Sequence, residues 1–374
     1  MPSNGNSSMV ITDGSRLIVE ALARAGAEAF IGYPITPANL LYSYAAARIP
    51  TMLPAPDEIT TVQWMAGLSA AGKLPVTATS FPGYALMIES VNMAFMMELP
   101  MVIILVQRLG PSTGTATCGA QGDLLLLRGQ ISGGQQLPVF CISDYHDCWE
   151  LSAEALRVAT ELRSPVVLLT SQESVMTRRS FDLSELGEIA PIKRKVYCGK
   201  EPFKPYDADN SLLPEFLPLG NEEHQVRLNA STHDKKGIVQ HSTPEALDNT
   251  IRLDRKARHN IARYTFYEYD RQEDAERLVI AFDITAAAAR DAVTQMRIEG
   301  DKVSLLIPKT LLPIPDEYYG IIHRYKTVVI AEENINAQYA TILFGQKLPG
   351  SIRTMGCLGR MIRPDEIVNE ARRS

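Results

Sequence analysis

Residues 99–106, LPMVIILV, form the longest dense apolar run of the chain. The run is far shorter than the roughly 20 residues that span a bilayer. Its branched side chains favour a strand that is buried on both faces. Residues 75–80 and 164–171 have a similar character, and helical patterns separate the three runs. Because continuous apolar strands that alternate with helices are typical of a covered parallel sheet, we predict an α/β fold.

The alternation of strands and helices stops near residue 190 and returns near residue 277. The chain between these points is rich in proline, asparagine and aspartate, and so long an irregular connection is uncommon inside a compact domain. We therefore expect a first α/β domain over 1–190, an extended interdomain segment over 191–270 and a smaller α/β domain over 271–374. Part of the segment, residues 244–264, has a pattern typical of a helix with charges on one side.

Composition argues against several classes of protein. The chain has 37 Lys and Arg against 43 Asp and Glu, a net charge of −6, and its basic residues form no cluster, so we expect no nucleic-acid partner. We also expect no membrane span, and no secretory signal in the N-terminal MPSNGNSSMV. The five cysteines include no C-x-x-C pair, which argues against a disulfide framework and a resident iron–sulfur cluster and favours the cytoplasm.

The segment GYPITP, residues 32–37, is a rigid corner between a strand pattern and a helix pattern. A residue before proline is driven out of the helical region, and proline fits the first position of a helix. We predict that Thr36 is the N-cap of the following helix and that Pro37 is its first residue. Such a corner lies at the carboxyl end of a strand, where open α/β sheets bind ligands. A capped helix without a ligand is the other interpretation.

Two further segments place charged residues near the ends of predicted elements. Glu58, in APDEIT, precedes an apolar helix rich in alanine and glycine. It is either a half-buried functional carboxylate or a solvated charge that favours the helix dipole. Arg108 ends the apolar strand and is followed by the loop GPSTG, whose N–H and hydroxyl groups could line a polar pocket. Its guanidinium either binds a carboxylate through two hydrogen bonds or forms an ordinary salt bridge.

The motifs GYPITP, DEI, TATSFPG, MELPMVIILVQRLGPSTG and QGDL occur in this order, and PFKPYDAD and IPKTLLPIP follow them. This arrangement resembles the alpha subunit of 2-oxoacid:ferredoxin oxidoreductases, nearest to the 2-oxoglutarate type, over nearly the whole chain. The resemblance implies that residues 1–190 form the pyrimidine-binding domain of a thiamine diphosphate enzyme. It also implies that residues 271–374 are similar to the transketolase C-terminal domain.

The resemblance assigns roles to individual residues. Glu58 matches the glutamate that hydrogen-bonds the aminopyrimidine ring, while Thr36 and Arg108 match residues that meet the 2-oxoacid. The implied catalytic residues are Glu58, Arg108 and Thr36; the cofactor-binding residues are Glu58, Ser80, Phe81, Pro82 and Gly83; the substrate-binding residues are Thr36, Arg108, Ser112 and Thr113. No metal ligand is expected on this chain.

Enzymes of the resembled family oxidatively decarboxylate a 2-oxoacid with coenzyme A to give acyl-CoA, carbon dioxide and reduced ferredoxin. The resemblance implies this activity, with 2-oxoglutarate as the substrate. The chain lacks the family's diphosphate–magnesium signature, a GDG followed by Asn. We therefore expect a beta subunit to share the thiamine diphosphate and to hold Mg²⁺ and a [4Fe–4S] cluster. We expect an α2β2 complex in which ferredoxin docks on the beta subunit.

Two departures from the family pattern leave alternatives open. The chain reads SFPG where the family usually reads SGPG, and LLLRGQISGGQQLPVF follows QGDL where the family often has Tyr-Gly-x-His-Gly-Glu. The substrate could instead be pyruvate or a branched-chain or aromatic 2-oxoacid, and the chain could be a diverged subunit kept for assembly. A non-oxidative thiamine enzyme is a third alternative, although such enzymes usually carry both cofactor-binding halves in one chain.

Two other groups of polar residues are interpreted as structural. His146, in DYHDCWE, has no second ligand at helical spacing, so we expect a structural histidine. Glu332 and Glu333 end a predicted strand of the second domain, and we expect them to face solvent or another subunit.

Overall fold

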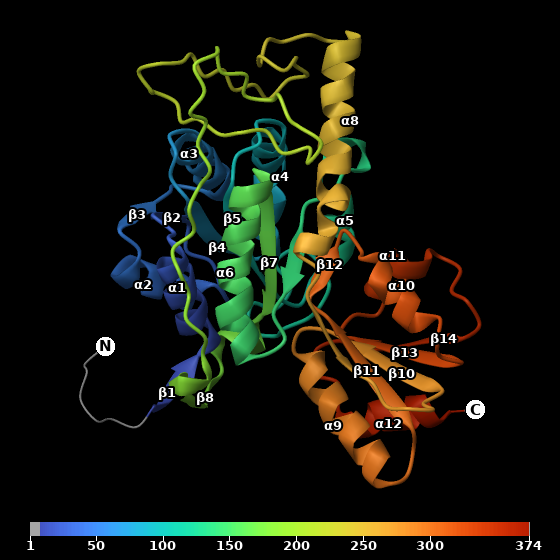
Figure 1. The fold of residues 1–374 in the computed structure, drawn as a ribbon. Coiled ribbons are helices and arrows are strands. Elements are labelled where there is room, and N and C mark those ends of the chain that lie inside the picture. The colour runs from blue at the N-terminus through green and yellow to red at the C-terminus, as the bar shows by residue number, and fades with distance from the viewer. Residues whose placement is uncertain (1–7, 374) are drawn as a thin grey trace.

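A computed structural model describes residues 8–373, and its two main sheets confirm the predicted α/β class (Figure 1). Residues 1–7 of the N-terminal segment lie outside this range. The larger sheet has seven strands. In spatial order they are β12 (Thr310–Leu312), β6 (Val139–Cys141), β7 (Pro165–Ser171), β5 (Met101–Gln107), β4 (Pro75–Thr79), β2 (Ala29–Gly32) and β3 (Thr51–Pro54). All neighbours are parallel except β12 and β6, so the carboxyl ends of the parallel strands meet at one edge.

Helices cover both faces of the larger sheet. One face carries α1 (Gly14–Ala25), α2 (Asn39–Arg48) and α6 (Tyr145–Leu162), and the other carries α3 (Glu58–Ala70), α4 (Phe81–Met96) and α5 (Leu124–Gly129). Helix α1 is capped at both ends. The Asp13 carboxylate accepts a hydrogen bond from the Arg16 N–H, and Gly26 has the left-handed φ of 105° that stops the helix.

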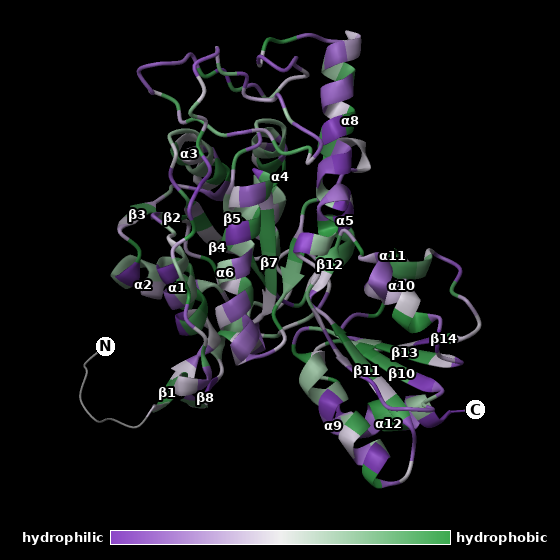
Figure 2. Cartoon of the chain, viewed as in Figure 1, coloured by the Kyte–Doolittle hydropathy of each residue, from purple (hydrophilic) through white to green (hydrophobic). Residues whose placement is uncertain are grey.

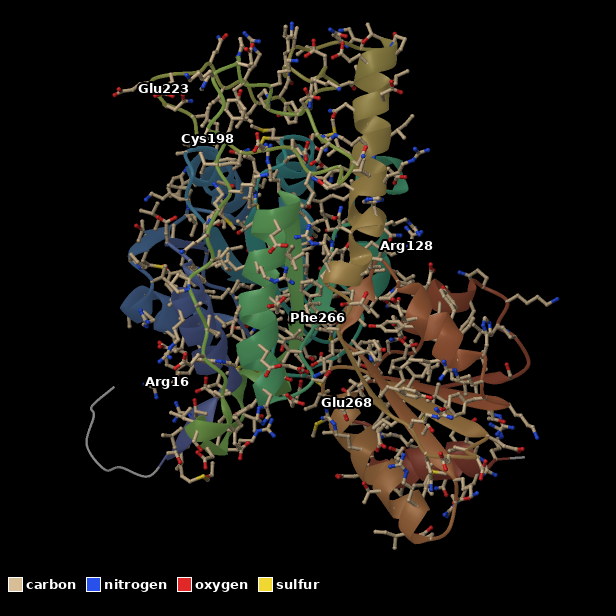
Figure 3. All side chains as sticks on the ribbon, viewed as in Figure 1. Arg16, Arg128, Cys198, Glu223, Phe266 and Glu268 are labelled. Atoms are coloured by element: carbon tan, nitrogen blue, oxygen red, sulfur yellow. The ribbon has the colours of Figure 1, made fainter. Side chains whose placement is uncertain are left out.

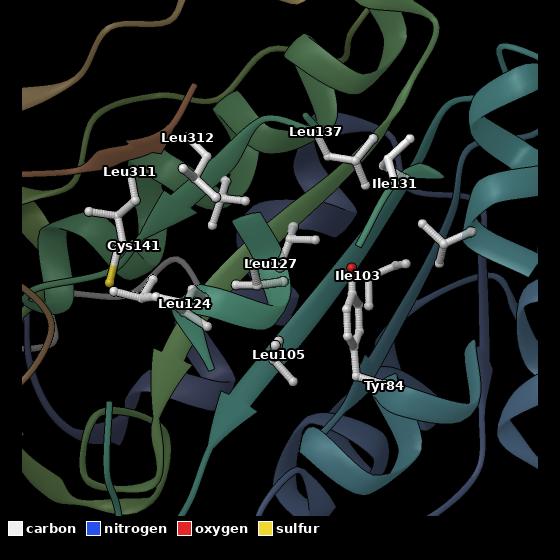
Figure 4. Packing of buried hydrophobic residues seen from close by; sticks show 14 of the residues in the cluster. Tyr84, Ile103, Leu105, Leu124, Leu127, Ile131, Leu137, Cys141, Leu311 and Leu312 are labelled. Atoms are coloured by element: carbon white, nitrogen blue, oxygen red, sulfur yellow. The ribbon is translucent and has the colours of Figure 1, made fainter. Parts of the chain in front are cut away.

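Strand β5 lies at the centre of the core, and all seven of its residues are buried. Its side chains alternate between two apolar clusters. Ile104 packs with α1 and α6, whereas Ile103 and Leu105 pack with α4 and α5. Figure 4 shows Tyr84 of α4 beside Ile103, and Figure 2 shows the apolar strands enclosed by more polar helices. Burial on both faces explains why the sequence of β5 is continuously apolar.

The second sheet has five strands, in the order β14 (Ile352–Gly356), β13 (Thr327–Glu332), β10 (Arg277–Ala281), β11 (Val303–Pro308) and β9 (Tyr267–Asp270). Only β9 is antiparallel to its neighbour in this sheet. Helices α9 (Thr285–Ile298) and α12 (Pro364–Arg372) cover one face, and α10 (Asp316–Ile322) and α11 (Gln338–Phe344) cover the other. The latter face belongs to the same apolar cluster as β5, so the two halves share a core.

The predicted domains 1–190, 191–270 and 271–374 stay a prediction, and two structural features cross their limits. Strand β12 leaves the C-terminal part and pairs with β6 of the first sheet, with Thr310 opposite Phe140. The C-terminal sheet already begins at Tyr267 in β9. In addition, β1 (Met9–Asp13) and β8 (Arg178–Asp182) form a small antiparallel pair beside α1.

The segment between the two sheets runs irregularly over the first domain before the predicted helix, α8 (Pro244–His259) (Figure 1). Buried ion pairs hold α8 against the end of α4. Glu98 is fully buried, and its carboxylate contacts the cations of Arg252 and Lys256, the latter at 2.7 Å. Burial alone would raise the pKa of Glu98, but the charges of Arg252, Lys256 and Arg163 lower it to about 2.

Among residues 8–373, no helix has both the length and the apolar content that a bilayer crossing requires.

Candidate functional site

Three residues selected from the sequence meet at the carboxyl edge of the parallel strands. Thr36 follows β2, Ser80 follows β4 and Arg108 follows β5. The Thr36 carbonyl oxygen accepts a hydrogen bond from Arg108 Nη1 at 2.7 Å and one from the Ser80 hydroxyl at 3.3 Å. The main chain of the proline corner is therefore fixed by side chains from the ends of β4 and β5, in the region where open α/β sheets bind ligands.

The predicted capping role of Thr36 is wrong. Helix α2 begins at Asn39, and its N-cap position is occupied by Ala38, which provides no side-chain cap. Residues 36–38 form a turn instead, in which the Ala38 N–H donates to the Ile35 carbonyl at 2.8 Å. The Thr36 hydroxyl accepts a hydrogen bond from the Asn39 amide at 3.1 Å. The turn separates Pro37 from the helix, so the rule for proline at the first helical position does not apply.

Glu58 is the first residue of α3, and only 6% of it is exposed. The cap of this helix is Asp57, whose carboxylate accepts a hydrogen bond from the Thr60 N–H at 2.7 Å. Among residues 8–373, the Glu58 carboxylate has no hydrogen-bond or ion-pair partner. A buried charge without a partner is costly, apart from the modest benefit of a helix N-terminus. The Glu58 side chain is therefore mostly buried rather than fully solvated, and its functional role stays a prediction.

The carboxylate of Glu58 lies against the start of α4, where Gly83 leaves room for it. A Cβ atom at position 83 would be 2.7 Å from Glu58 Oε1 and 2.3 Å from the Thr79 hydroxyl oxygen. Both distances are shorter than van der Waals contact, so only glycine fits without displacing its neighbours. Phe81 and Pro82, which open α4, are half-buried. The predicted SFPG segment is thus adjacent to both Glu58 and Thr36.

Arg108 and Asp123 form a second, electrostatic part of the site. Arg108 is 5% exposed and Asp123, from QGDL, is 4% exposed. Burial raises the pKa of Asp123 to about 7, although the nearby charge of Arg108 opposes the shift. Arg108 Nε and Asp123 Oδ2 both lack a hydrogen-bond partner among residues 8–373. Sequence reasoning missed Asp123, because only the fold shows that its carboxyl is desolvated beside a guanidinium.

Ser112 and Thr113 lie in a different environment from the other candidates. Both are exposed, in the loop that follows Arg108. The base of this loop is closed by hydrogen bonds from the Leu109 N–H to the Cys118 carbonyl, at 2.7 Å, and from the Thr115 N–H to the Leu109 carbonyl, at 3.0 Å. No printed contact joins either side chain to Thr36, Glu58 or Arg108 within residues 8–373, so their role stays a prediction.

The expectation for Glu332 and Glu333 is wrong, because both are buried. The Glu332 carboxylate accepts hydrogen bonds from the Tyr339 and Ala340 N–H groups at the start of α11, at 2.9 and 3.2 Å. Glu333 accepts one from the Ile362 N–H at 3.1 Å, and burial raises its pKa to about 7.

Asp283, which sequence reasoning also missed, lies between the two sheets and is fully buried. It accepts hydrogen bonds from Gln107 at 3.2 Å and Ser174 at 3.3 Å, and burial raises its pKa to about 8. His146 lies 3.2 Å from the exposed Glu185 carboxylate and packs edge-on against Phe181, with ring centroids 5.3 Å apart.

Comparison with protein families decides the affiliation. Residues 20–252 match the family model described as pyruvate flavodoxin/ferredoxin oxidoreductase, thiamine diphosphate-binding. The chain belongs to this family. Residues 275–366 match the model for core domain II of pyruvate:ferredoxin oxidoreductase. The resemblance stated from the motifs is thereby confirmed, and so is the expectation of a thiamine diphosphate-binding domain followed by a second domain.

Curated relatives of this oxidoreductase family member favour the 2-oxoglutarate type. This chain is 30% identical over 331 residues to the 2-oxoglutarate synthase subunit KorA of Methanocaldococcus jannaschii. The alignment covers 87% of this chain and 88% of the relative. This chain is also 31% identical over 338 residues to the 2-oxoglutarate oxidoreductase subunit KorA of Mycobacterium tuberculosis, where 88% of this chain matches 51% of the relative. A ketoisovalerate oxidoreductase subunit VorB of Methanothermobacter thermautotrophicus is 29% identical over 313 residues.

Solved structures confirm the fold of this family member. The 2-oxoglutarate:ferredoxin oxidoreductase of Magnetococcus marinus, determined with 2-oxoglutarate, coenzyme A and succinyl-CoA bound, superposes with a TM-score of 0.90 at 27% identity. The match covers 97% of this chain but spans 65% of that longer chain. A split-gene transketolase, at a TM-score of 0.53 and 14% identity, supports the transketolase-like fold alone.

Proposed function

We propose that this chain is the alpha subunit of a thiamine diphosphate-dependent 2-oxoacid:ferredoxin oxidoreductase. The reaction is the oxidative decarboxylation of 2-oxoglutarate with coenzyme A to an acyl-CoA, carbon dioxide and reduced ferredoxin. The observation that carries the proposal is the buried Glu58 carboxylate, which has no partner within residues 8–373 and lies against Gly83. The names of the 2-oxoglutarate relatives support the choice of substrate.

The residues at the carboxyl edge fit a thiamine ring. Glu58 provides an unpartnered acceptor for a proton on a ring nitrogen, Gly83 leaves the space beside it open, and the Thr79 hydroxyl lies next to the same space. When bound, the cofactor supplies the carbon nucleophile and electron sink that the loss of carbon dioxide requires. The contribution of this chain is to position the ring and to hold one proton at the Glu58 carboxylate.

Arg108 is the residue that we assign to the anionic substrate. One of its nitrogens is fixed by the Thr36 carbonyl, which orients the guanidinium plane, and its Nε lacks a partner within residues 8–373. Asp123 does not neutralise this charge while it is protonated, and its pKa is raised to about 7 by burial. Arg108 can therefore bind a carboxylate in the bidentate manner typical of arginine. Ser112 and Thr113 are proposed as further substrate contacts, supported by their place in the adjoining loop.

The proposal includes a beta subunit in an α2β2 complex that contributes the diphosphate site with Mg²⁺, the [4Fe–4S] cluster and the ferredoxin surface. Exposed apolar side chains on one face of the first sheet support such a partner. Ile59 and Trp64 of α3 are 44% and 42% exposed, and Leu86 of α4 is 53% exposed. Large apolar and aromatic side chains on neighbouring helices are typical of interface cores. We also propose a cytoplasmic location, supported by five free cysteines.

The decisive experiment compares Glu58→Gln with wild type in the complex reconstituted with the beta subunit. We expect the complex to assemble and the rate of viologen-dye reduction by 2-oxoglutarate and coenzyme A to fall by about 10²- to 10⁴-fold, the range for a lost acid–base group. Glu150→Gln, exposed on α6 on the opposite face of the sheet from α4, is the matched control and should keep full activity. Unchanged activity in Glu58→Gln would instead identify a diverged assembly subunit.

A further inference from the structure

The segment 121–125, which carries Asp123, follows the strands of the first sheet but is bound by the C-terminal part of the chain. The Gln121 N–H donates to the Glu333 carbonyl at 2.9 Å, and the Gln121 amide oxygen accepts from the Glu333 N–H at 2.6 Å. The Gln121 amide nitrogen donates to the Phe282 carbonyl at 2.7 Å. The second sheet therefore contributes to the position of Asp123.

Gln338, the first residue of α11, reaches the same segment with both ends of its side-chain amide. Its Nε2 donates to the Gly122 carbonyl at 2.8 Å, and its Oε1 accepts from the Leu125 N–H at 3.0 Å. Gln338 is buried, and Figure 3 shows Arg128, in the last turn of α5, beside the C-terminal domain. Because the two bonded residues flank Asp123 in the chain, Gln338 fixes the main chain that carries the Asp123 carboxyl.

Asp123 occupies the N-cap position of α5, but its carboxyl does not cap the helix. An N-cap residue usually has an extended backbone, and its side-chain oxygen accepts from the N–H of the second or third helical residue. Asp123 has a φ of −103° and a ψ of 0° instead. The N–H of the second helical residue, Leu125, donates to Gln338. Gln338 thus replaces the cap that an aspartate ordinarily provides.

Freed from capping, the Asp123 carboxyl faces Arg108. Its Oδ2 has no hydrogen-bond partner among residues 8–373, and burial raises its pKa to about 7 against the charge of Arg108. The neighbouring elements carry further charged side chains: Arg128 on α5, Asp283 after β10, and Glu332 and Glu333 at the end of β13. Each of these three carboxylates accepts hydrogen bonds of its own. If the Asp123 carboxylate capped α5, it would gain an N–H donor, and such a bond lowers a carboxyl pKa.

We propose that Gln338 is a positioning residue, through which the C-terminal domain keeps the Asp123 carboxyl turned toward Arg108. The role of Arg108 in substrate binding rests on the proposed function, whereas the bonds of Gln338 and the ionisation of Asp123 are properties of the chain itself. Without the Gln338 amide, the Leu125 N–H loses its acceptor. Asp123 then takes the extended N-cap conformation, accepts that N–H and turns away from Arg108.

The test measures the unfolding free energy of the full chain against pH in Gln338→Met, whose side chain has a similar length but no amide. Burial raises the pKa of Asp123 to about 7, so the folded wild type binds about one extra proton between about pH 4 and 7 and loses stability as pH rises. Gln338→Met should lower this pKa and remove about one proton from the slope, as Asp123→Asn does. Adding Asp123→Asn to Gln338→Met should cause no further change.

Further variants separate positioning from a loose domain contact. Gln338→Glu keeps an oxygen for the Leu125 N–H and should keep at least the wild-type slope. Thr285→Val removes a different bond to the segment, from the Thr285 hydroxyl to the Gln121 amide oxygen at 3.2 Å, and should lower stability without changing the slope. Gln346→Met, exposed after α11, should match wild type. If Gln338→Met does not fold, Gln338→Asn, which withdraws the amide by one methylene, should also flatten the slope.

Kinetics of the complex with the beta subunit test the consequence for Arg108. Gln338→Met should lose the rise in KM for 2-oxoglutarate above about pH 7, with little change in kcat. A complex that does not act on 2-oxoglutarate would refute the proposed function, and the pH dependence of stability would still decide the role of Gln338. An unchanged slope in Gln338→Met, a flattening that Thr285→Val shares, or equal slopes in wild type and Asp123→Asn overturns the proposal. A rise in KM that persists in Gln338→Met overturns the link to Arg108.

Discussion

The ammonium group of Lys256 lies 2.7 Å from the carboxylate of Glu98, and both side chains are almost completely buried. Lys256→Met removes one of the cations that neutralise the buried Glu98 carboxylate. We therefore expect a loss of about 3–5 kcal/mol in the free energy of unfolding. Chemical denaturation measures it. Lys326→Met, which breaks the exposed pair with Glu276, is the control and should cost less than about 1 kcal/mol. A similar small loss in Lys256→Met would show that the buried pair contributes little.

The contact of Gly83 with Glu58 and Thr79 predicts that Gly83→Ala is destabilising. The added methyl group would overlap the Thr79 hydroxyl and the Glu58 carboxylate, at a cost of about 1–3 kcal/mol. Gly67→Ala is the matched control within α3, because no heavy atom lies within 4 Å of the added Cβ. It should stabilise the chain by about 0.5–1 kcal/mol, the propensity difference between alanine and glycine. Thermal unfolding of both variants checks the opposite signs; equal shifts would contradict the close contact.

Arg108→Lys tests the role of the guanidinium fork. A lysine ammonium can reach either the Thr36 carbonyl or a ligand carboxylate, but it has no rigid second pair of donors. We expect kcat/KM for 2-oxoglutarate in the reconstituted complex to fall about 10- to 100-fold, equivalent to one charged hydrogen bond. Arg178→Lys, whose side chain is 66% exposed, should retain wild-type kinetics. Steady-state kinetics with normal assembly distinguishes this from a folding defect.

Asp123 predicts a pH dependence of stability. An unfolded aspartate loses its proton near pH 3.8, whereas burial holds the folded pKa at about 7. Between these values the folded chain binds the extra proton, so the stabilising contribution is complete below about pH 4 and is lost as pH rises to about 7. Over this window the slope of unfolding free energy against pH should be less negative in Asp123→Asn. The difference from wild type should correspond to about one bound proton. Asp274→Asn, which removes an exposed carboxylate, should leave the slope unchanged.

The same group predicts a kinetic effect in the complex. Above about pH 7 the ionised Asp123 competes with the substrate carboxylate for Arg108, so KM for 2-oxoglutarate should rise in wild type. Asp123→Asn should have a KM that stays flat from pH 7 to 8.5. A parallel rise in both proteins would exclude Asp123 as the competing group.

Much of the fold could be predicted because its elements are long and periodic. The run that became β5 is apolar throughout since both faces are buried, and Gly26 ends α1 because it adopts a left-handed φ. Short strands such as β6 and β12 were not predicted. Each has three residues, and their pairing partners lie far apart in the sequence, so no local pattern specifies them.

The candidate site was likewise predictable only in part. Glu58, Thr36 and Arg108 follow or begin regular elements next to prolines and glycines, so the sequence indicates their positions at the carboxyl edge. Arg108 and Ser80 hold the main chain at Thr36, and Glu333 is buried against Ile362, so both features depend on contacts made by distant parts of the chain. Gln338 was overlooked because its partners, Gly122 and Leu125, lie in a distant part of the chain, and such a contact leaves no trace in local sequence.

The crossing of β12 onto the first sheet restricts how the subunit can move during turnover. Leu311 and Leu312 are inserted in the apolar cluster beside Cys141 and Leu127, as Figure 4 shows. A hinge motion that separates the two sheets would first have to break the pairing of β12 with β6 and expose that cluster to water. The paired strand and the shared cluster therefore hold the two sheets in a fixed relative orientation.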